Sequence, residues 1–169
     1  MSLKRDHDKF ICDQLLKTIE VDAEFVRMGN DRDEPDAIYK SEGKVIGIEV
    51  GTAYYDESDA KQEWTLARGD RAFPAEGFEL RAGGVIPDPD SLVCEKVQHE
   101  IDDKGDKRYV GADEIWLCVE QRAPLSDEAS VASCVKQLVI PGGHRFAKIY
   151  IVYLAPLSDG GGYVAVQIS

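Results

Sequence analysis

Two acidic residues beside a predicted turn have the types and spacing best suited to chemistry. Asp36 opens a stretch of alternating residues that ends at Ser41, and Glu49 lies in a second stretch that begins at Lys44. The Glu-Gly pair between the two stretches is typical of a hairpin turn, because glycine readily takes the positive φ that such turns need. If Ser41 pairs with Lys44, Asp36 falls directly opposite Glu49 on one face of the hairpin.

Carboxylates held side by side repel each other unless one is protonated or a cation lies between them. Hard divalent ions prefer oxygen ligands, and Mg²⁺ commonly binds one or two protein carboxylates together with water and phosphate oxygens. We therefore predict that Asp36 and Glu49 bind Mg²⁺ or Mn²⁺. The opposite face of the hairpin would carry an apolar set that packs on a core: Ala37, Tyr39, Ile46, Ile48 and Val50.

These residues resemble the PD-(D/E)xK nuclease superfamily, in which a Pro-Asp opens one strand, an acid lies on the next strand, and a lysine follows two residues later. The match is to Pro35-Asp36 and to Gly47-Ile48-Glu49. The resemblance runs from the first predicted helix to the strand near Val119. It implies metal-dependent hydrolysis of phosphodiester bonds in DNA or RNA. The chain departs from the pattern at Gly51, which stands where the family has its lysine.

Some members of the superfamily with a Gly-Ile-Glu strand supply a basic group from the following helix. Lys104 lies three residues after Ile101 and seven after Val97, so it extends the inward-facing stripe of a predicted helix. Its ammonium can then reach the sheet, orient the attacking water or stabilise the charge of the transition state. Gln98, earlier on the same helix, is a further candidate. The alternative is that Lys104 caps the negative end of the helix dipole.

The resemblance also implies an acid from the first helix that is directed at the metal. Asp13 and Glu20 both remain open for this role, and we take Asp13 as the expected third metal ligand. A second, literal Pro-Asp…Asp-x-Lys occurs between residues 89 and 104. Its intervening apolar residues recur at helical period, and in a helix its first and second acids would stand about 18 Å apart along the axis. We interpret that match as chance.

The charge of the chain restricts its possible partners. Thirty-two acidic residues against twenty basic ones give a formal net charge of −12. Proteins that bind nucleic acid usually display a basic patch, whereas the basic residues here form only small groups at 104–108 and 142–145. Nucleic acid remains a possible partner, although an electrostatically weak one. Two alternatives follow: a nuclease-like domain without catalysis that acts as an acidic protein-binding or regulatory module, or an inhibitor of the immunity-protein type.

Four widely spaced cysteines, at positions 12, 94, 118 and 134, include no Cys-x-x-Cys and have no histidine nearby. We interpret them as buried, reduced thiols of a cytoplasmic protein. No apolar run approaches the roughly 20 residues of a membrane span, and the first residues lack the apolar segment of a signal peptide. We therefore expect no membrane association. The oligomeric state is left open.

The pattern of elements predicts one α/β domain over residues 1–169, with a mixed central sheet flanked by helices. Its order of helix, three strands, helix and strand is that of a restriction-endonuclease-like core. Apolar residues at helical period predict helices over 5–20, 88–105 and 126–138, with a possible helix over 58–68. Strands are expected over 23–28, 36–41, 44–50, 114–119, 146–154 and 163–168.

Overall fold

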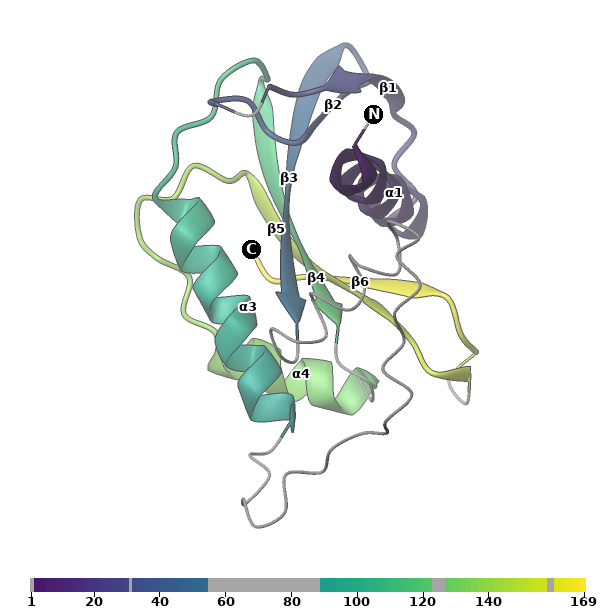
Figure 1. Cartoon of the computed structure of the whole chain (residues 1–169), viewed down its shortest axis with the longest axis vertical. Helices are drawn as coiled ribbons and strands as arrows, with labels where there is room; N and C mark the ends of the chain where they lie inside the picture. Colours follow the sequence, from purple (N-terminus) through teal and green to yellow (C-terminus); the bar gives the residue numbers. More distant parts are fainter. Residues whose placement is uncertain (1, 31, 55–88, 123–126, 158–159) are drawn as a thin grey trace.

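The computed structural model describes residues 2–30, 32–54, 89–122, 127–157 and 160–169, which form a six-stranded sheet flanked by three helices (Figure 1). The predicted mixed α/β class is confirmed. In chain order the elements are α1 (Leu3–Thr18), β1 (Glu24–Met28), β2 (Ala37–Ser41), β3 (Lys44–Tyr54), α3 (Pro89–Gly105), β4 (Glu114–Arg122), α4 (Glu128–Gln137), β5 (Lys148–Leu154) and β6 (Tyr163–Gln167). The possible helix over 58–68 lies outside the described residues.

The strands lie in the sheet in the order in which they occur in the chain. β1, β2 and β3 form an antiparallel meander, β4 and β5 add to β3 in parallel, and β6 closes the far edge antiparallel to β5. The helix α3 lies in the crossover between β3 and β4. The expected order of helix, three strands, helix and strand is therefore confirmed.

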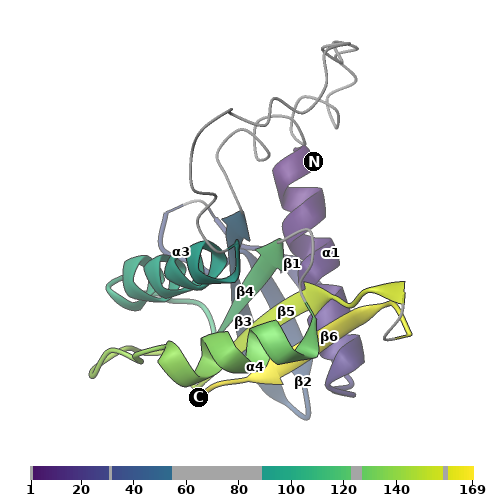
Figure 2. The same cartoon turned by 90° about the horizontal axis from the view of Figure 1, so that it is seen from below.

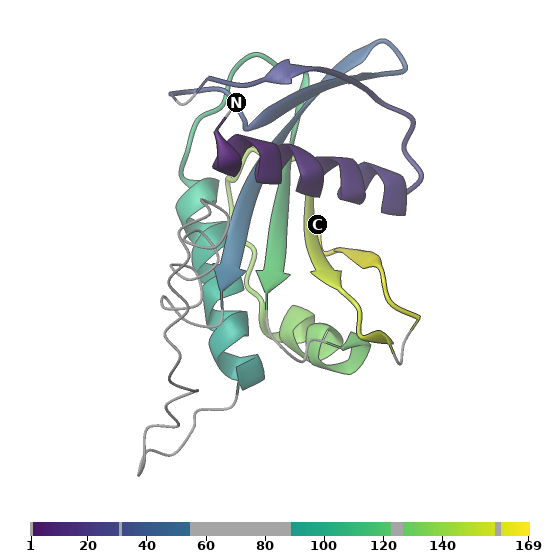
Figure 3. The same ribbon diagram turned by 45° about the vertical axis from the view of Figure 1, so that its right-hand side comes forward.

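Helices cover both faces of the sheet. Figure 3 shows α1 lying across the strands, and Figure 2 shows α3 and α4 on the opposite side. The core under α1 contains all five apolar residues predicted from the hairpin: Ala37, Tyr39, Ile46, Ile48 and Val50. The core under α3 and α4 joins Val97 and Ile101 of α3 to Val131 of α4 and to the inward side chains of β4 and β5. Both faces of the central strands are therefore buried.

The β2–β3 hairpin has the register that its turn predicts. Ser41 pairs with Lys44, and the two residues between them, Glu42 and Gly43, have φ of +50° and +83°. Positive φ at both central positions matches the twist of the flanking strands. The pairing continues to Ala37 opposite Ile48, so the alternation along β3 directs Glu49 toward the face that α3 covers. β3 extends to Tyr54, beyond the predicted end, because its parallel pairing with β4 continues to that residue.

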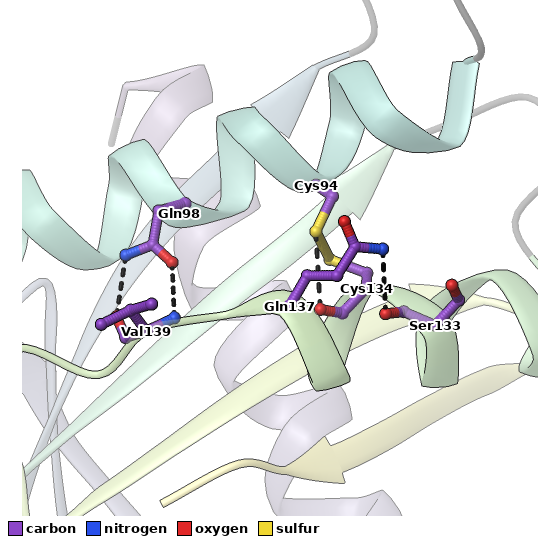
Figure 4. The surroundings of a disulfide bond; sticks show 6 residues. All are labelled: Cys94, Gln98, Ser133, Cys134, Gln137 and Val139. Carbon is purple, nitrogen blue, oxygen red and sulfur yellow. Dashed lines mark hydrogen bonds between the residues drawn. A yellow bond between two sulfur atoms is a disulfide. The ribbon is translucent and has the colours of Figure 1, made fainter.

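Two contacts fix α3 against α4 and the segment that follows it (Figure 4). The Gln98 side chain donates to the carbonyl of Val139 at 2.9 Å and accepts from its N–H at 2.8 Å. Cys94 of α3 and Cys134 of α4 form a disulfide, whereas Cys12 and Cys118 are free and buried. The expectation of four reduced thiols is thus wrong for one pair. The two cysteines lie on different helices, and packing brings them together.

The literal Pro-Asp…Asp-x-Lys match falls within α3, so its acids are spread along one helix, as predicted. No helix in the described part of the chain combines the length and the apolar character needed to cross a membrane.

Candidate active site

Asp36 immediately precedes β2, and contacts with the residue that follows β1 and with β3 hold this segment in place. Its carbonyl accepts from the N–H of Gly29 at 2.9 Å, and its Oδ2 accepts from the N–H of Val50 at 2.8 Å. The preceding Pro35 packs on Gly47 so closely that a Cβ at Gly47 would lie 2.3 Å from the proline Cγ. The absence of a side chain at Gly47 therefore lets the Pro-Asp segment approach β3.

Glu49 lies on β3 and is paired with Lys104 of α3. The Lys104 ammonium donates to Glu49 Oε1 at 2.7 Å, and the two side chains are 15% and 8% exposed. Burial first, and then the charge of Asp36, raise the pKa of Glu49, while Lys104 acts in the opposite direction. Burial lowers the pKa of Lys104, but the charges of Glu49 and Asp36 outweigh it, so this pKa is raised overall. The ammonium is therefore held charged among carboxylates.

Glu100 covers the backbone two residues after Glu49. A Cβ at Gly51 would lie 2.5 Å from Glu100 Oε2. Burial raises the pKa of Glu100, and the charge of Lys104 opposes this effect. The cation near Glu49 thus comes from α3, while another α3 side chain occupies the space above Gly51. Lys104 is not a solvent-exposed cap at the end of its helix.

A third carboxylate comes from α1, at a residue that the sequence analysis did not select. Asp8 is 4% exposed and lines the same cavity as Asp36 and Glu49. Burial, and then the charge of Asp36, raise the pKa of Asp8 to about 6, with Lys4 acting against them. One signal for Asp8 was present in the sequence: it lies three and four residues before the buried Ile11 and Cys12, on the inward stripe of the helix.

The structure does not bring Asp13 into this cavity. Its carboxylate accepts from Lys9 Nζ at 2.5 Å and from Tyr39 Oη at 2.7 Å. Glu20 is exposed and follows the end of α1, with φ of +55°. The acid that α1 contributes is therefore Asp8, because Asp13 lies on another side of the helix.

The three carboxylates and Lys104 line a cavity of about 410 Å³ between the start of α1, the loop before β2 and the end of α3. A second cavity of about 530 Å³ shares Lys4, Asp8 and Lys104 with it and extends along β3. Basic side chains line the first cavity as well: Lys4, Arg5, Arg32 and Lys107. The site thus combines several carboxylates with cations that can contact an anionic ligand.

The loop before β2, which forms one wall, is shaped by its own polar contacts. Asn30 Oδ1 accepts from the N–H groups of Arg32, Asp33 and Glu34 at 2.9–3.2 Å. The Glu34 carboxylate receives two hydrogen bonds from Arg27, at 2.6 and 2.7 Å. These contacts hold the loop in place beside Asp36.

The donor chemistry fits a hard divalent cation. Asp8, Asp36 and Glu49 offer only oxygen ligands. Burial, and then repulsion from Asp36, raise the pKa values of Asp8 and Glu49, and a bound cation would oppose both effects. Within the described ranges, no three His, Cys, Asp or Glu side chains already form a cluster arranged to hold a metal. Lys104 instead neutralises Glu49 directly.

His7, the neighbour of Asp8, takes part in a different contact. Its Nε2 lies 2.7 Å from Oε2 of Glu120, a β4 residue that is 2% exposed. Arg122 Nε lies 3.5 Å from the other oxygen of Glu120. The hydrogen bond with Glu120 raises the pKa of His7 despite its burial. His7 therefore stabilises a buried acid of β4, and it does not line either cavity.

Comparisons with known proteins identify no family for this chain. No family model matches it, and no curated protein matches significantly. A solved structure described as Pyrococcus furiosus SfsA in complex with Ca²⁺ matches with 14% sequence identity and a TM-score of 0.30, over 96% of this chain and 60% of that one. The chain thus spans three fifths of the length of that protein. A TM-score of 0.30 does not establish a shared fold.

Proposed function

We propose that the chain is a metal-dependent phosphodiesterase of the PD-(D/E)xK nuclease type that cleaves nucleic acid. The observation that carries the proposal is the position of Lys104, whose ammonium lies 2.7 Å from Glu49 in the cavity that Asp36 and Asp8 also line. The site thus has acids from the segment before β2, from β3 and from α1, and a lysine from α3. This combination matches the chemistry that the Pro-Asp and Gly-Ile-Glu segments predict.

Asp36, Glu49 and Asp8 would hold the ion, Mg²⁺ or Mn²⁺. When bound, such an ion lowers the pKa of a coordinated water and neutralises the charge of the scissile phosphate. Val50 fixes one oxygen of Asp36 through its N–H, so that carboxylate is oriented before any ligand arrives. Lys104 would orient the attacking water and stabilise the negative charge that develops on the phosphate.

The basic side chains that line the cavity suit an anionic backbone despite the net charge of the whole chain. Arg5 is anchored by a hydrogen bond to the carbonyl of Gly29, and Lys107 lies 3.1 Å from the half-exposed Asp103. Lys4 and Arg32 line the same cavity. Local cations of this kind can bind phosphates even where the net charge is negative. Binding should weaken steeply with salt, because phosphate contacts release counterions.

A second function remains open because the net charge is −12 and a cation already neutralises Glu49. In that case the domain would bind a protein partner or regulate a larger complex without cleaving nucleic acid. The two functions differ in whether the carboxylates support turnover.

The deciding assay is cleavage of labelled single- and double-stranded DNA and RNA with Mg²⁺ or Mn²⁺. We expect cleavage that EDTA abolishes and that Asp36→Asn and Glu49→Gln each reduce by at least about 10²-fold, the scale for loss of a preorganised electrostatic group. Asp13→Asn is the matched control, since Asp13 lies outside the cavity, and it should cleave like wild type. Absence of metal-dependent cleavage, or equal activity in all variants, would contradict the proposal. Metal binding without cleavage would favour the binding module.

A further inference from the structure

Tyr109 lies in the loop between α3 and β4, and its hydroxyl is buried at the wall of the cavity. Its ring packs on Phe146, with ring centroids 5.8 Å apart. The hydroxyl has no hydrogen-bond partner among the residues that the structure describes. A buried donor without a partner is unfavourable, and native structures rarely keep one without a reason. The sequence contains no motif that singles out this residue.

The neighbours of the hydroxyl identify what it faces. Tyr109 lines the cavity together with Glu49, Lys104 and Asp36. Burial, followed by the negative charge of Glu49, raises its pKa well above the usual value. The phenol therefore stays protonated and remains a hydrogen-bond donor throughout the physiological pH range. A hydrogen-bond-type interaction with the Glu49 side chain also contributes to this shift, although the contact falls outside strict hydrogen-bond geometry.

Glu49 has room for a second donor. Its Oε1 accepts from Lys104. Among the described residues, no donor forms a hydrogen bond with Oε2. Carboxylates and imidazoles that bind metals are usually held by hydrogen bonds from neighbouring groups, which fix their orientation. Tyr109 is placed to supply such a bond, because it lines the same cavity as Glu49 and the two side chains already affect each other's pKa.

We propose that Tyr109 is a positioning residue for Glu49, and that its hydroxyl donates a hydrogen bond to the Glu49 carboxylate when that carboxylate binds a divalent cation. This inference rests on the proposed function, because it assumes that Glu49 is a metal ligand. In the metal-bound site, the buried Tyr109 hydroxyl would then have the Glu49 carboxylate as its hydrogen-bond acceptor. It also explains why a polar aromatic residue, and not an apolar one, packs on Phe146 at this wall.

The test is calorimetric titration of Mn²⁺ into the metal-free full-length protein and into Tyr109→Phe. The substitution removes only the hydroxyl and retains the ring that packs on Phe146, and a thermal melt checks that the variant is folded. We expect Mn²⁺ affinity to fall by about 10- to 100-fold, the usual effect of losing a group that orients a metal ligand. In cleavage assays the Mn²⁺ concentration for half-maximal rate should rise by a similar factor, while the rate at saturating Mn²⁺ recovers most of the wild-type value.

Tyr39→Phe is the matched control. It also removes one tyrosine hydroxyl, which donates to Asp13 at 2.7 Å outside the cavity, and it should leave Mn²⁺ affinity unchanged. If Tyr109→Phe binds Mn²⁺ as tightly as wild type while Glu49→Gln loses binding, the role of Tyr109 is overturned and the proposed function stands. If wild type itself binds no Mn²⁺, both are overturned. Equal weakening by Tyr39→Phe would reveal a general loss of stability and would also overturn the role of Tyr109.

Discussion

The ammonium of Lys104 lies 2.7 Å from Oε1 of Glu49, although 55 residues separate them in the chain. The contact joins the end of α3 to the middle of β3. It is largely shielded from water, since the two side chains are 15% and 8% exposed. An ion pair in this setting is sensitive to the loss of either partner, because the remaining charge stays buried without compensation.

The first prediction concerns this pair. Lys104→Met should lower the free energy of unfolding by about 3–5 kcal/mol at pH 7.5, the scale for removing one partner of a buried ion pair. The double variant Lys104→Met with Glu49→Gln should recover much of the loss, because neither charge is then left alone. Urea denaturation of the wild type, both single variants and the double variant measures the coupling. Strictly additive effects would show that the two side chains do not interact in solution.

Asp8 carries the second prediction, on pH dependence. Its pKa is raised to about 6 in the folded protein from a value near 4 in the unfolded chain. The folded state therefore binds the proton more tightly, and Asp8 reduces stability progressively as the pH rises from about 4 to 6, with the full penalty above 6. Asp8→Asn should thus stabilise the protein at pH 7.5, by on the order of 2 kcal/mol.

The gain from Asp8→Asn should shrink as the pH falls below 6 and vanish near pH 4. Urea denaturation across this range provides the measurement. Asp13→Asn is the control and should show no such gain, because Asp13 accepts hydrogen bonds from Lys9 and Tyr39. A stability difference between Asp8→Asn and wild type that is constant with pH would contradict the assignment.

Gly47 is the subject of the third prediction. A methyl group at this position would meet the Pro35 ring and the side chains of Ile115 and Ala112. Gly47→Ala should therefore cost about 1–3 kcal/mol of stability, as overpacking does, and should weaken Mn²⁺ binding by displacing the segment that carries Asp36. Gly142→Ala is the matched control, because a Cβ there meets nothing within 4 Å. If both variants behaved alike, the contact with Pro35 would not position the site.

The fourth prediction concerns the disulfide between Cys94 and Cys134, which tethers α3 to α4 (Figure 4). The two cysteines are 40 residues apart, and closing a loop of that size in the unfolded chain corresponds to about 4 kcal/mol on the chain-entropy relation. Reduction with dithiothreitol should lower the free energy of unfolding by an amount of this order. Cys94→Ser with Cys134→Ser should already be less stable and insensitive to dithiothreitol. Identical unfolding of the wild type with and without reductant would argue against the bond.

The parts of the site that were predictable from the sequence depend on turn geometry and helical spacing. The Glu-Gly turn determines the register of the β2–β3 hairpin. The register in turn determines which face of the sheet Glu49 points to, and it places Asp36 near the same position. The inward position of Lys104 followed from its spacing after Val97 and Ile101, which are both buried. These conclusions depend on residues close in sequence, where period and turn geometry decide the outcome.

Longer-range features were not predictable in the same way. Asp13 was preferred to Glu20 because it lies deeper in the predicted first helix, and Asp8 was not among the candidates. Cys94 and Cys134 meet through the packing of two helices, which spacing alone does not reveal. The burial of Tyr109 depends on how the loop before β4 returns to the sheet. The catalytic and metal-binding roles themselves stay predictions.

The most direct test of the central claim is the anomalous scattering of Mn²⁺ in crystals grown or soaked with that ion. We predict a strong peak in the cavity, coordinated by carboxylate oxygens of both Asp36 and Glu49, with Asp8 adjacent and the Lys104 ammonium released from Glu49 Oε1 or retained beside it. A peak that disappears in Glu49→Gln crystals would complete the assignment. No peak between Asp36 and Glu49 at millimolar Mn²⁺, with the Lys104–Glu49 pair unchanged, would contradict the account.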